Sequence, residues 1–224
     1  MDFTHPNATI LLLWLAFAAT HLILASVRVE PRLRARLGQT GYLGLYSAVA
    51  LGLFVPLFWV YLENRYAGPW FWAVPLHGLV LWACYLAMAF AITLIAGAFL
   101  SASPASIQGG STKPSGVLAV TRHPLIMGLA IFGAIHVFMN GNAPSVAFFS
   151  GFVLFGFVGA WHQDARKLHH ELPGFREFCA STQFFPLLSP ASWRGLRAVP
   201  IWVWCLGVAL ATAIRWAHGP LLGV

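Results

Sequence analysis

Long apolar runs, separated by short polar segments, dominate the hydropathy pattern of the chain. Because one bilayer crossing needs about 20 apolar residues, the pattern predicts six membrane-spanning helices, at 7–27, 41–62, 74–99, 122–139, 143–162 and 198–217. Residues 140–144 (NGNAP) have the composition of a tight turn, so we expect the fourth and fifth spans to form an antiparallel hairpin. The expected fold is an all-α polytopic transmembrane bundle, with residues 1–224 as a single domain.

Two polar stretches between the spans differ in pattern. Residues 101–117 are rich in Ser, Gly and Pro and have no helical period, which predicts an irregular cytoplasmic loop. In residues 163–185, apolar residues recur among charged ones, as they do on an amphipathic helix at a membrane interface. We expect such a cytoplasmic interfacial helix, broken near Pro173.

Composition agrees with a membrane protein. Only 8% of the residues are charged, against roughly 25% in a soluble domain, which excludes a soluble fold and makes the lipid bilayer the main partner. The net charge of +7 does not indicate nucleic-acid binding, because no basic patch is interleaved with exposed aromatic residues. The three cysteines are scattered, without the spacing of a disulfide framework or a thiolate metal site.

The basic residues predict the orientation. Eleven of them fall in the first, third and fifth loops, whereas only Arg65 and Arg215 fall on the other side. Cytoplasmic loops carry the excess of Lys and Arg, so we expect both termini on the non-cytoplasmic side.

Two histidines lie inside predicted spans, His21 in the first and His136 in the fourth. A polar side chain at that depth is costly unless it is paired or ligated. Either residue alone is more typical of a hydrogen bond to a neighbouring helix. Two imidazoles from separate helices can, however, ligate a haem iron from both faces, although their spacing does not show that they meet.

A second group of candidate residues lies at the predicted loop ends. Arg122 and His123 precede Pro124, which suits the first turn of a helix; this segment is either a ligand site or a snorkelling basic helix start. Asp164 could pair with Arg122 or Arg166. We interpret such a pair as a structural latch, with ligand binding by Arg122 as the less favoured alternative.

Several segments together resemble the NnrU family, which includes the plant and cyanobacterial zeta-carotene isomerases. They are HLILASVR, GYLGLYS, NRYAG, GVLAVTRHPLIMG followed by AIH, GAW-x-x-D-x-R, FREF and ST-x-x-FP, between about residues 12 and 188; the span at 198–217 is additional. The resemblance implies haem b, with its iron bound by His21 and His136. In the isomerases, the reduced haem is thought to open a coordination position and permit rotation about a cis double bond of a polyene. NnrU itself is named for an association with nitrite and nitric oxide reduction. A bacterial inner membrane is the expected location.

Some positions depart from the isomerase pattern. Gly133 stands where the isomerases have a Cys, three residues before the second ligand, and Asn64 and Phe155 stand where they have His. Depth is a further difficulty, because a rise of 1.5 Å per residue places His21 about 10 Å inside the cytoplasmic boundary and His136 about 20 Å along its helix from His123. Tilt or a kink could close this gap; otherwise His123 is the reserve ligand.

Two alternative functions are compatible with these residues. A membrane methyltransferase of the isoprenylcysteine type would bind S-adenosylmethionine at an RHP segment with a downstream glutamate, and the corresponding residues here are Arg122, His123, Pro124, Gly128, Glu171 and Glu177. A non-enzymatic haem protein could instead serve electron transfer or assembly, with a respiratory membrane complex of nitrogen-oxide metabolism as its partner. Such a protein would leave cis-polyenes unchanged.

Overall fold

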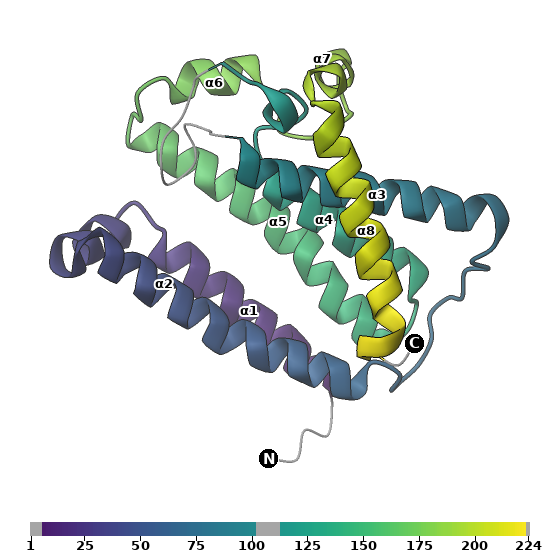
Figure 1. Cartoon of the computed structure of the whole chain (residues 1–224). Helices are drawn as coiled ribbons and strands as arrows, with labels where there is room; N and C mark the ends of the chain where they lie inside the picture. Colours follow the sequence, from purple (N-terminus) through teal and green to yellow (C-terminus); the bar gives the residue numbers. More distant parts are fainter. Residues whose placement is uncertain (1–5, 102–112, 223–224) are drawn as a thin grey trace. The chain divides into compact units, whose positions relative to one another are not determined.

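Figure 1 shows the computed structural model, which describes residues 6–101 and 113–222. Within these residues the regular structure is helical, and the β pairing is limited to an isolated bridge between Trp70 and Asn142. The predicted all-α class is confirmed. Five described helices are long and apolar enough to cross a membrane, namely α1 (Pro6–Leu24), α2 (Val29–Asn64), α3 (Gly78–Leu100), α5 (Ala143–His169) and α8 (Ile201–Leu222). The remaining predicted span, the fourth, corresponds to α4 (Pro124–Met139), which has only 16 residues, about 24 Å of helix.

The chain divides into two compact units, each built from separate stretches of sequence. The first unit comprises Met1–Val74 and His136–His170, and the second comprises Pro75–Ile135 and Glu171–Val224. Helix α4 contributes its last residues, from His136 on, to the first unit. The single domain expected from the sequence stays a prediction, and each unit is described by itself.

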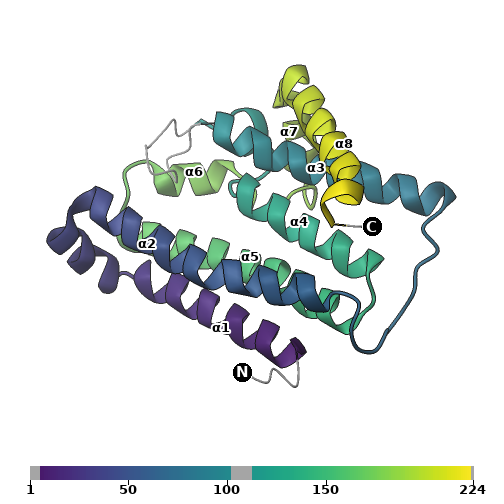
Figure 2. The ribbon, with the colours of Figure 1, turned by 60° about the horizontal axis from the view of Figure 1, so that its bottom comes forward.

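In the first unit, α1 packs against both α2 and α5, and α1 and α2 lie side by side in both views (Figures 1 and 2). Trp14 of α1 is 6% exposed, and its indole Nε1 donates to the carbonyl oxygen of Phe148 on α5 at 2.9 Å. Gly151 lies directly against the Trp14 ring, where a Cβ atom would overlap the indole. A residue without a side chain is therefore required for this close approach.

Helix α2 begins earlier than predicted, because the arginine-rich segment expected as a loop is helical from Val29. Gly38 interrupts the helix with a φ of +70°, a conformation that glycine adopts without the steric cost of a Cβ atom. The predicted span, residues 41–62, therefore follows a short basic helix and a kink. At the other end, the Asn64 side chain donates to the Val60 carbonyl at 2.8 Å and closes the last turn.

The predicted tight turn between the fourth and fifth spans is confirmed, since α4 ends at Met139 and α5 begins at Ala143. Asn142 caps α5 by accepting a hydrogen bond from the Ser145 backbone N–H at 2.9 Å, as expected for an N-cap asparagine. Helix α5 does not end at 162 but continues to His169. The amphipathic segment is therefore not one separate helix: its first part extends α5, and α6 (Phe175–Ser181) follows the predicted break at Pro173.

In the second unit, α3 packs against α8, and Gly207 of α8 lies against Thr93 of α3 with no room for a Cβ atom. On α4, a Cβ atom at Gly128 would lie 2.7 Å from the Ala91 carbonyl oxygen of α3. Most of the predicted loop, residues 102–112, lies outside the described residues, but its end forms the 3₁₀ helix η1 (Gly116–Ala119). Two further short elements, α7 (Pro190–Gly195) and η2 (Leu196–Ala198), contact η1.

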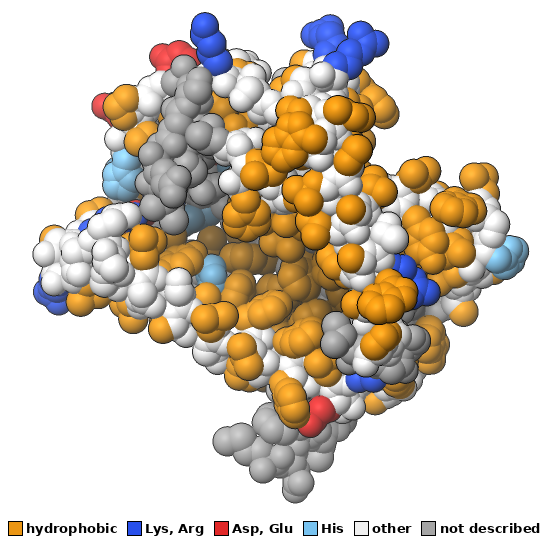
Figure 3. Space-filling model, in the orientation of Figure 1, with side chains coloured by type: hydrophobic (Ala, Val, Ile, Leu, Met, Phe, Trp, Pro, Cys, Tyr) orange, Lys and Arg blue, Asp and Glu red, His pale blue; other side chains and the backbone are white. Residues whose placement is uncertain are grey.

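Apolar side chains cover the outside of α8, as Figure 3 shows. Ile201 is 76% exposed and Trp216 is 79% exposed. Large exposed apolar surfaces are unusual on soluble proteins, whereas lipid tails accept them. The chain is therefore an integral membrane protein.

Candidate functional site

A cluster of aromatic rings surrounds His21 in the first unit. The imidazole ring centroid lies 3.9 Å from that of Phe17, 4.9 Å from that of Tyr46 and 5.4 Å from that of Phe155. These neighbours come from α1, α2 and α5, which means that all three helices position the histidine. We call this set of rings, with Trp14 and Phe152, the aromatic cluster.

The backbone determines which nitrogen of His21 is available. Nδ1 lies 2.9 Å from the Phe17 carbonyl oxygen, and because a carbonyl only accepts, Nδ1 carries the proton. In the neutral ring Nε2 then holds the lone pair, which is the form that ligates a metal. His218 on α8 makes the same bond to the Ile214 carbonyl at 2.7 Å, and its side chain, like that of His21, is half-buried. The aromatic surroundings therefore distinguish His21, not the bond.

His136 belongs to the same unit and is linked to the aromatic cluster. Its ring stacks on that of Phe149 of α5, with 4.4 Å between the centroids. The Phe149 ring lies 6.4 Å from that of Phe152, which in turn lies 5.1 Å from Trp14. The two predicted iron ligands thus lie in one unit, connected by aromatic rings.

The two histidines contact α5 at different levels. His21 lies against Phe155 and His136 against Phe149, which are six residues apart on one helix, or about 9 Å along its axis. The depth difference expected from ideal helices is therefore present. Imidazole nitrogens in an apolar, ring-lined setting fit the chemistry of a haem iron and its macrocycle, and ligation of one iron by both would have to close this separation.

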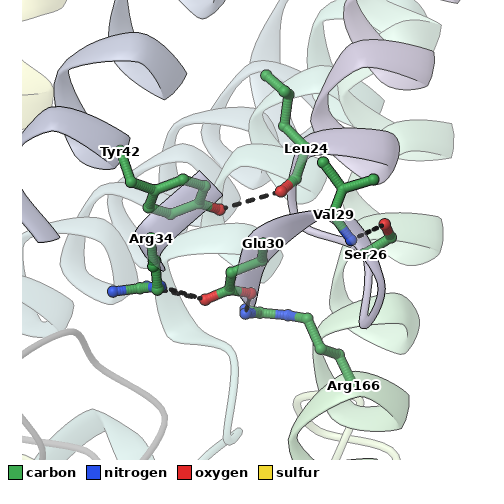
Figure 4. Close-up of polar contacts among 7 residues, drawn as sticks. All are labelled: Leu24, Ser26, Val29, Glu30, Arg34, Tyr42 and Arg166. Carbon is green, nitrogen blue, oxygen red and sulfur yellow. Dashed lines mark hydrogen bonds and ion pairs between the residues drawn. The ribbon is translucent and has the colours of Figure 1, made fainter. Parts of the chain in front are cut away.

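An ionic group lies in the same unit, where α2 begins (Figure 4). Glu30 is 7% exposed. One of its carboxylate oxygens accepts from Arg34 Nε at 2.9 Å, and the other contacts the Arg166 guanidinium. The Tyr42 hydroxyl donates to the Leu24 carbonyl at 3.3 Å, and the Arg34 guanidinium lies over the Tyr42 ring at 4.6 Å. We call Glu30, Arg34 and Arg166 the ionic group.

Sequence analysis missed Glu30. The partner that the structure shows for Arg166 is this glutamate on α2, whereas Asp164 was the partner expected. The available signal was the spacing of Glu30 and Arg34, which at four residues apart is typical of a helical ion pair. Asp164 itself is 7% exposed on α5; its pairing with Arg122 or Arg166 stays a prediction.

In the second unit, the segment Thr121–Arg122–His123 is bound to residues 182–184. The Thr121 hydroxyl donates to the Phe184 carbonyl at 2.6 Å, and the Arg122 backbone N–H donates to the Gln183 carbonyl at 2.8 Å. The Arg122 guanidinium also lies over the Phe184 ring at 5.1 Å. Two sequence motifs, TRHP and ST-x-x-FP, therefore form one clamp, and we call residues 121–123 and 182–184 the backbone clamp.

His123 lies inside the backbone clamp. Its side chain is 4% exposed, and its ring makes an edge contact with that of Phe184, with 5.3 Å between the centroids. Its role as the reserve ligand stays a prediction, because it belongs to the other unit. Glu171 and Glu177, the acidic members of the predicted methyltransferase site, are exposed.

The positions that depart from the isomerase pattern have structural roles here. Phe155 packs against the His21 ring, Asn64 closes the last turn of α2, and Gly133 is buried on α4. A phenyl ring, which cannot bind a metal, thus lies against His21.

The fold and this site define a polytopic helical membrane protein with an aromatic-lined histidine. The chain belongs to the NnrU family, since residues 9–224 match the family model described as NnrU protein. This match extends past the region of resemblance expected from the motifs and includes α8.

Two curated proteins resemble the chain at low sequence identity. The chain is 27% identical, over 190 residues, to the chloroplastic 15-cis-zeta-carotene isomerase of Zea mays, with 80% of this chain and 50% of the relative covered. It is 23% identical, over 199 residues, to the chloroplastic 15-cis-zeta-carotene isomerase of Arabidopsis thaliana, with 87% and 53% covered. The chain thus spans about half the length of these relatives. No solved structure matches it.

Proposed function

We propose that this protein binds haem b and catalyses cis–trans isomerisation of a lipophilic polyene. The observation that carries the proposal is the setting of His21, whose Nδ1 is held by the Phe17 carbonyl while aromatic rings from three helices surround the imidazole. Membership of the NnrU family and sequence similarity to two 15-cis-zeta-carotene isomerases support it.

In this proposal His21, through Nε2, and His136 would hold the haem iron. Neutral imidazoles suit an apolar interior, because they bind iron without bringing a charge into it. The Phe17 carbonyl fixes the proton on Nδ1 and orients the ring, as partners of the second nitrogen do in other metal sites. His123, which belongs to the other unit, stays the alternative ligand expected from the sequence, and Arg122 orders the segment that carries it.

When bound, a reduced haem with an open coordination position would supply a reversible interaction with a cis double bond, without net redox change. The chain's own part is to exclude water and present an apolar, aromatic surface to the polyene, through residues such as Phe17, Phe54 and Phe152. Because Gly133 has no side chain, ligand exchange by a thiol at that position is not available here.

An absorption spectrum of the detergent-purified chain tests haem binding. We expect a Soret band that sharpens and shifts on reduction, and we expect His136→Ala to alter it more than His123→Ala, because the proposal makes His136 the second ligand. The opposite order would make His123 the ligand. A wild-type chain that takes up no haem would contradict the proposal.

The reaction is tested by adding a cis-polyene to the reduced, haem-loaded protein and following the isomer ratio by chromatography. Conversion to the trans isomer is expected without another protein. An unchanged polyene would favour the electron-transfer or assembly role. Binding of S-adenosylmethionine to a haem-free chain would favour the methyltransferase.

A further inference from the structure

The ionic group carries more positive than negative charge. Glu30 contacts both Arg34 and Arg166, so one carboxylate faces two guanidinium groups. Asp164 and Lys167 lie three residues apart on α5, where side chains are neighbours, and together they add no net charge. The polar end of the first unit therefore retains an unbalanced positive charge.

Arg166 also has hydrogen-bonding capacity that its described surroundings do not use. Its side chain is 17% exposed, and among the described residues its buried Nε–H has no acceptor. An unsatisfied buried donor on a charged group is costly, by more than a typical hydrogen bond contributes. An anionic oxygen group would balance the excess positive charge and accept the hydrogen bond that Nε–H does not make.

The ionic group is also continuous with the aromatic cluster. From the His21 ring, centroid distances of 4.9 Å lead to Tyr46 and of 6.0 Å from Tyr46 to Tyr42. The Arg34 guanidinium then lies 4.6 Å from the Tyr42 centroid. A ligand whose apolar body lies against His21 would therefore contact the aromatic rings, and its anionic edge would lie next to the guanidinium groups.

We propose that Arg166, assisted by Arg34, binds the carboxylates of a tetrapyrrole whose apolar face lies on the aromatic cluster. This inference rests on the proposed function, and it assigns the ionic group as the site for the propionates. Guanidinium groups bind carboxylates and phosphates in the same planar, charge-assisted manner. A phospholipid headgroup is therefore the other source of such an anion, and the experiment has to separate the two.

The test compares ferric haem b with its dimethyl ester, which has no free carboxylate, by Soret titration of the purified full chain. Wild type should bind the acid more tightly than the ester. Arg166→Met should weaken binding of the acid by about tenfold, the effect of losing one hydrogen bond to a charged group, and should leave the ester unchanged. Arg166→Lys should recover part of the loss.

The control is Arg32→Met, which removes an exposed arginine from the turn of α2 that also carries Arg34 and should change neither affinity. Arg34→Met gives a second variant in case Arg166→Met does not fold, as judged by size-exclusion chromatography. It should weaken binding of the acid by a smaller factor.

Each of the following results would overturn the inference. Equal affinity of wild type for acid and ester, or an equal effect of Arg166→Met on both, would show that Arg166 does not bind the carboxylates while haem binding stands. Loss of co-purifying phospholipid from Arg166→Met, measured by mass spectrometry, with unchanged haem affinity would assign the site to a lipid phosphate. Failure of wild type to bind either porphyrin would overturn the proposed function as well.

Discussion

The backbone clamp of the second unit and the aromatic cluster of the first unit differ in what their most distinctive residues contact. In the clamp, Thr121 and Arg122 bind main-chain carbonyls of residues 183 and 184, so the most distinctive sequence motif holds two segments together. In the aromatic cluster, His21 is bound through Nδ1 to a main-chain carbonyl, and we propose that its Nε2 binds the haem iron. A distinctive motif can therefore serve packing between segments and need not mark a ligand-binding group.

The largest predicted effect concerns the packing of the aromatic cluster. Trp14→Ala removes a ring that is 6% exposed and hydrogen-bonded to Phe148. We expect a loss of about 3–5 kcal/mol in the free energy of unfolding, together with weaker haem retention. Unfolding in SDS measures the first and the Soret band the second. Trp161→Ala, at a position that is 66% exposed, is the control; an equal loss there would mean that the cluster is not a core.

The next prediction concerns the ionic group. Glu30→Gln leaves Arg166 and Arg34 without their shared carboxylate, and removing one partner of a buried ion pair costs about 3 kcal/mol. The same SDS titration measures this loss. Glu63→Gln, at an exposed position near the other end of α2, should have almost no effect. Comparable stability of the two variants would show that the ionic group does not stabilise the unit.

A smaller effect is expected beside the backbone clamp. The Ser192 hydroxyl, fully buried, donates to the Val120 carbonyl at 2.6 Å and accepts from the Leu187 N–H at 2.8 Å. Ser192→Ala should lower stability by about 1–3 kcal/mol while leaving haem affinity unchanged. Ser181→Ala, at an exposed position, is the matched control. A haem loss in Ser192→Ala without unfolding would extend the functional site into the second unit.

Hydropathy predicted the helices because the bilayer imposes one long apolar run for each span. It could not predict that α5 continues to His169, since the apolar run of the span ends near 162 and the amphipathic pattern after it was assigned to a separate interfacial helix. The basic helix before Gly38 was missed for a similar reason, because arginines predict membrane sidedness rather than backbone conformation. The glycine itself was the available signal for the kink.

The residue types of the candidate site could be predicted from the sequence, but the contacts between those residues could not. His21 and His136 stood out because imidazoles are rare within spans, and both lie in the first unit. Their levels along α5 followed from the helical rise. Glu30, by contrast, pairs with a residue 136 positions away, and no local pattern encodes a contact between helices so distant in sequence.

The haem content of two histidine variants tests the central claim most directly. His21 and His218 make the same Nδ1 bond to a carbonyl four residues earlier, but of the two, within the described part of the chain, His21 alone contacts aromatic rings. The ratio of haem to protein, measured as the pyridine haemochrome, should fall to a small fraction of the wild-type value in His21→Ala and stay at that value in His218→Ala. Full haem content in His21→Ala would contradict the claim.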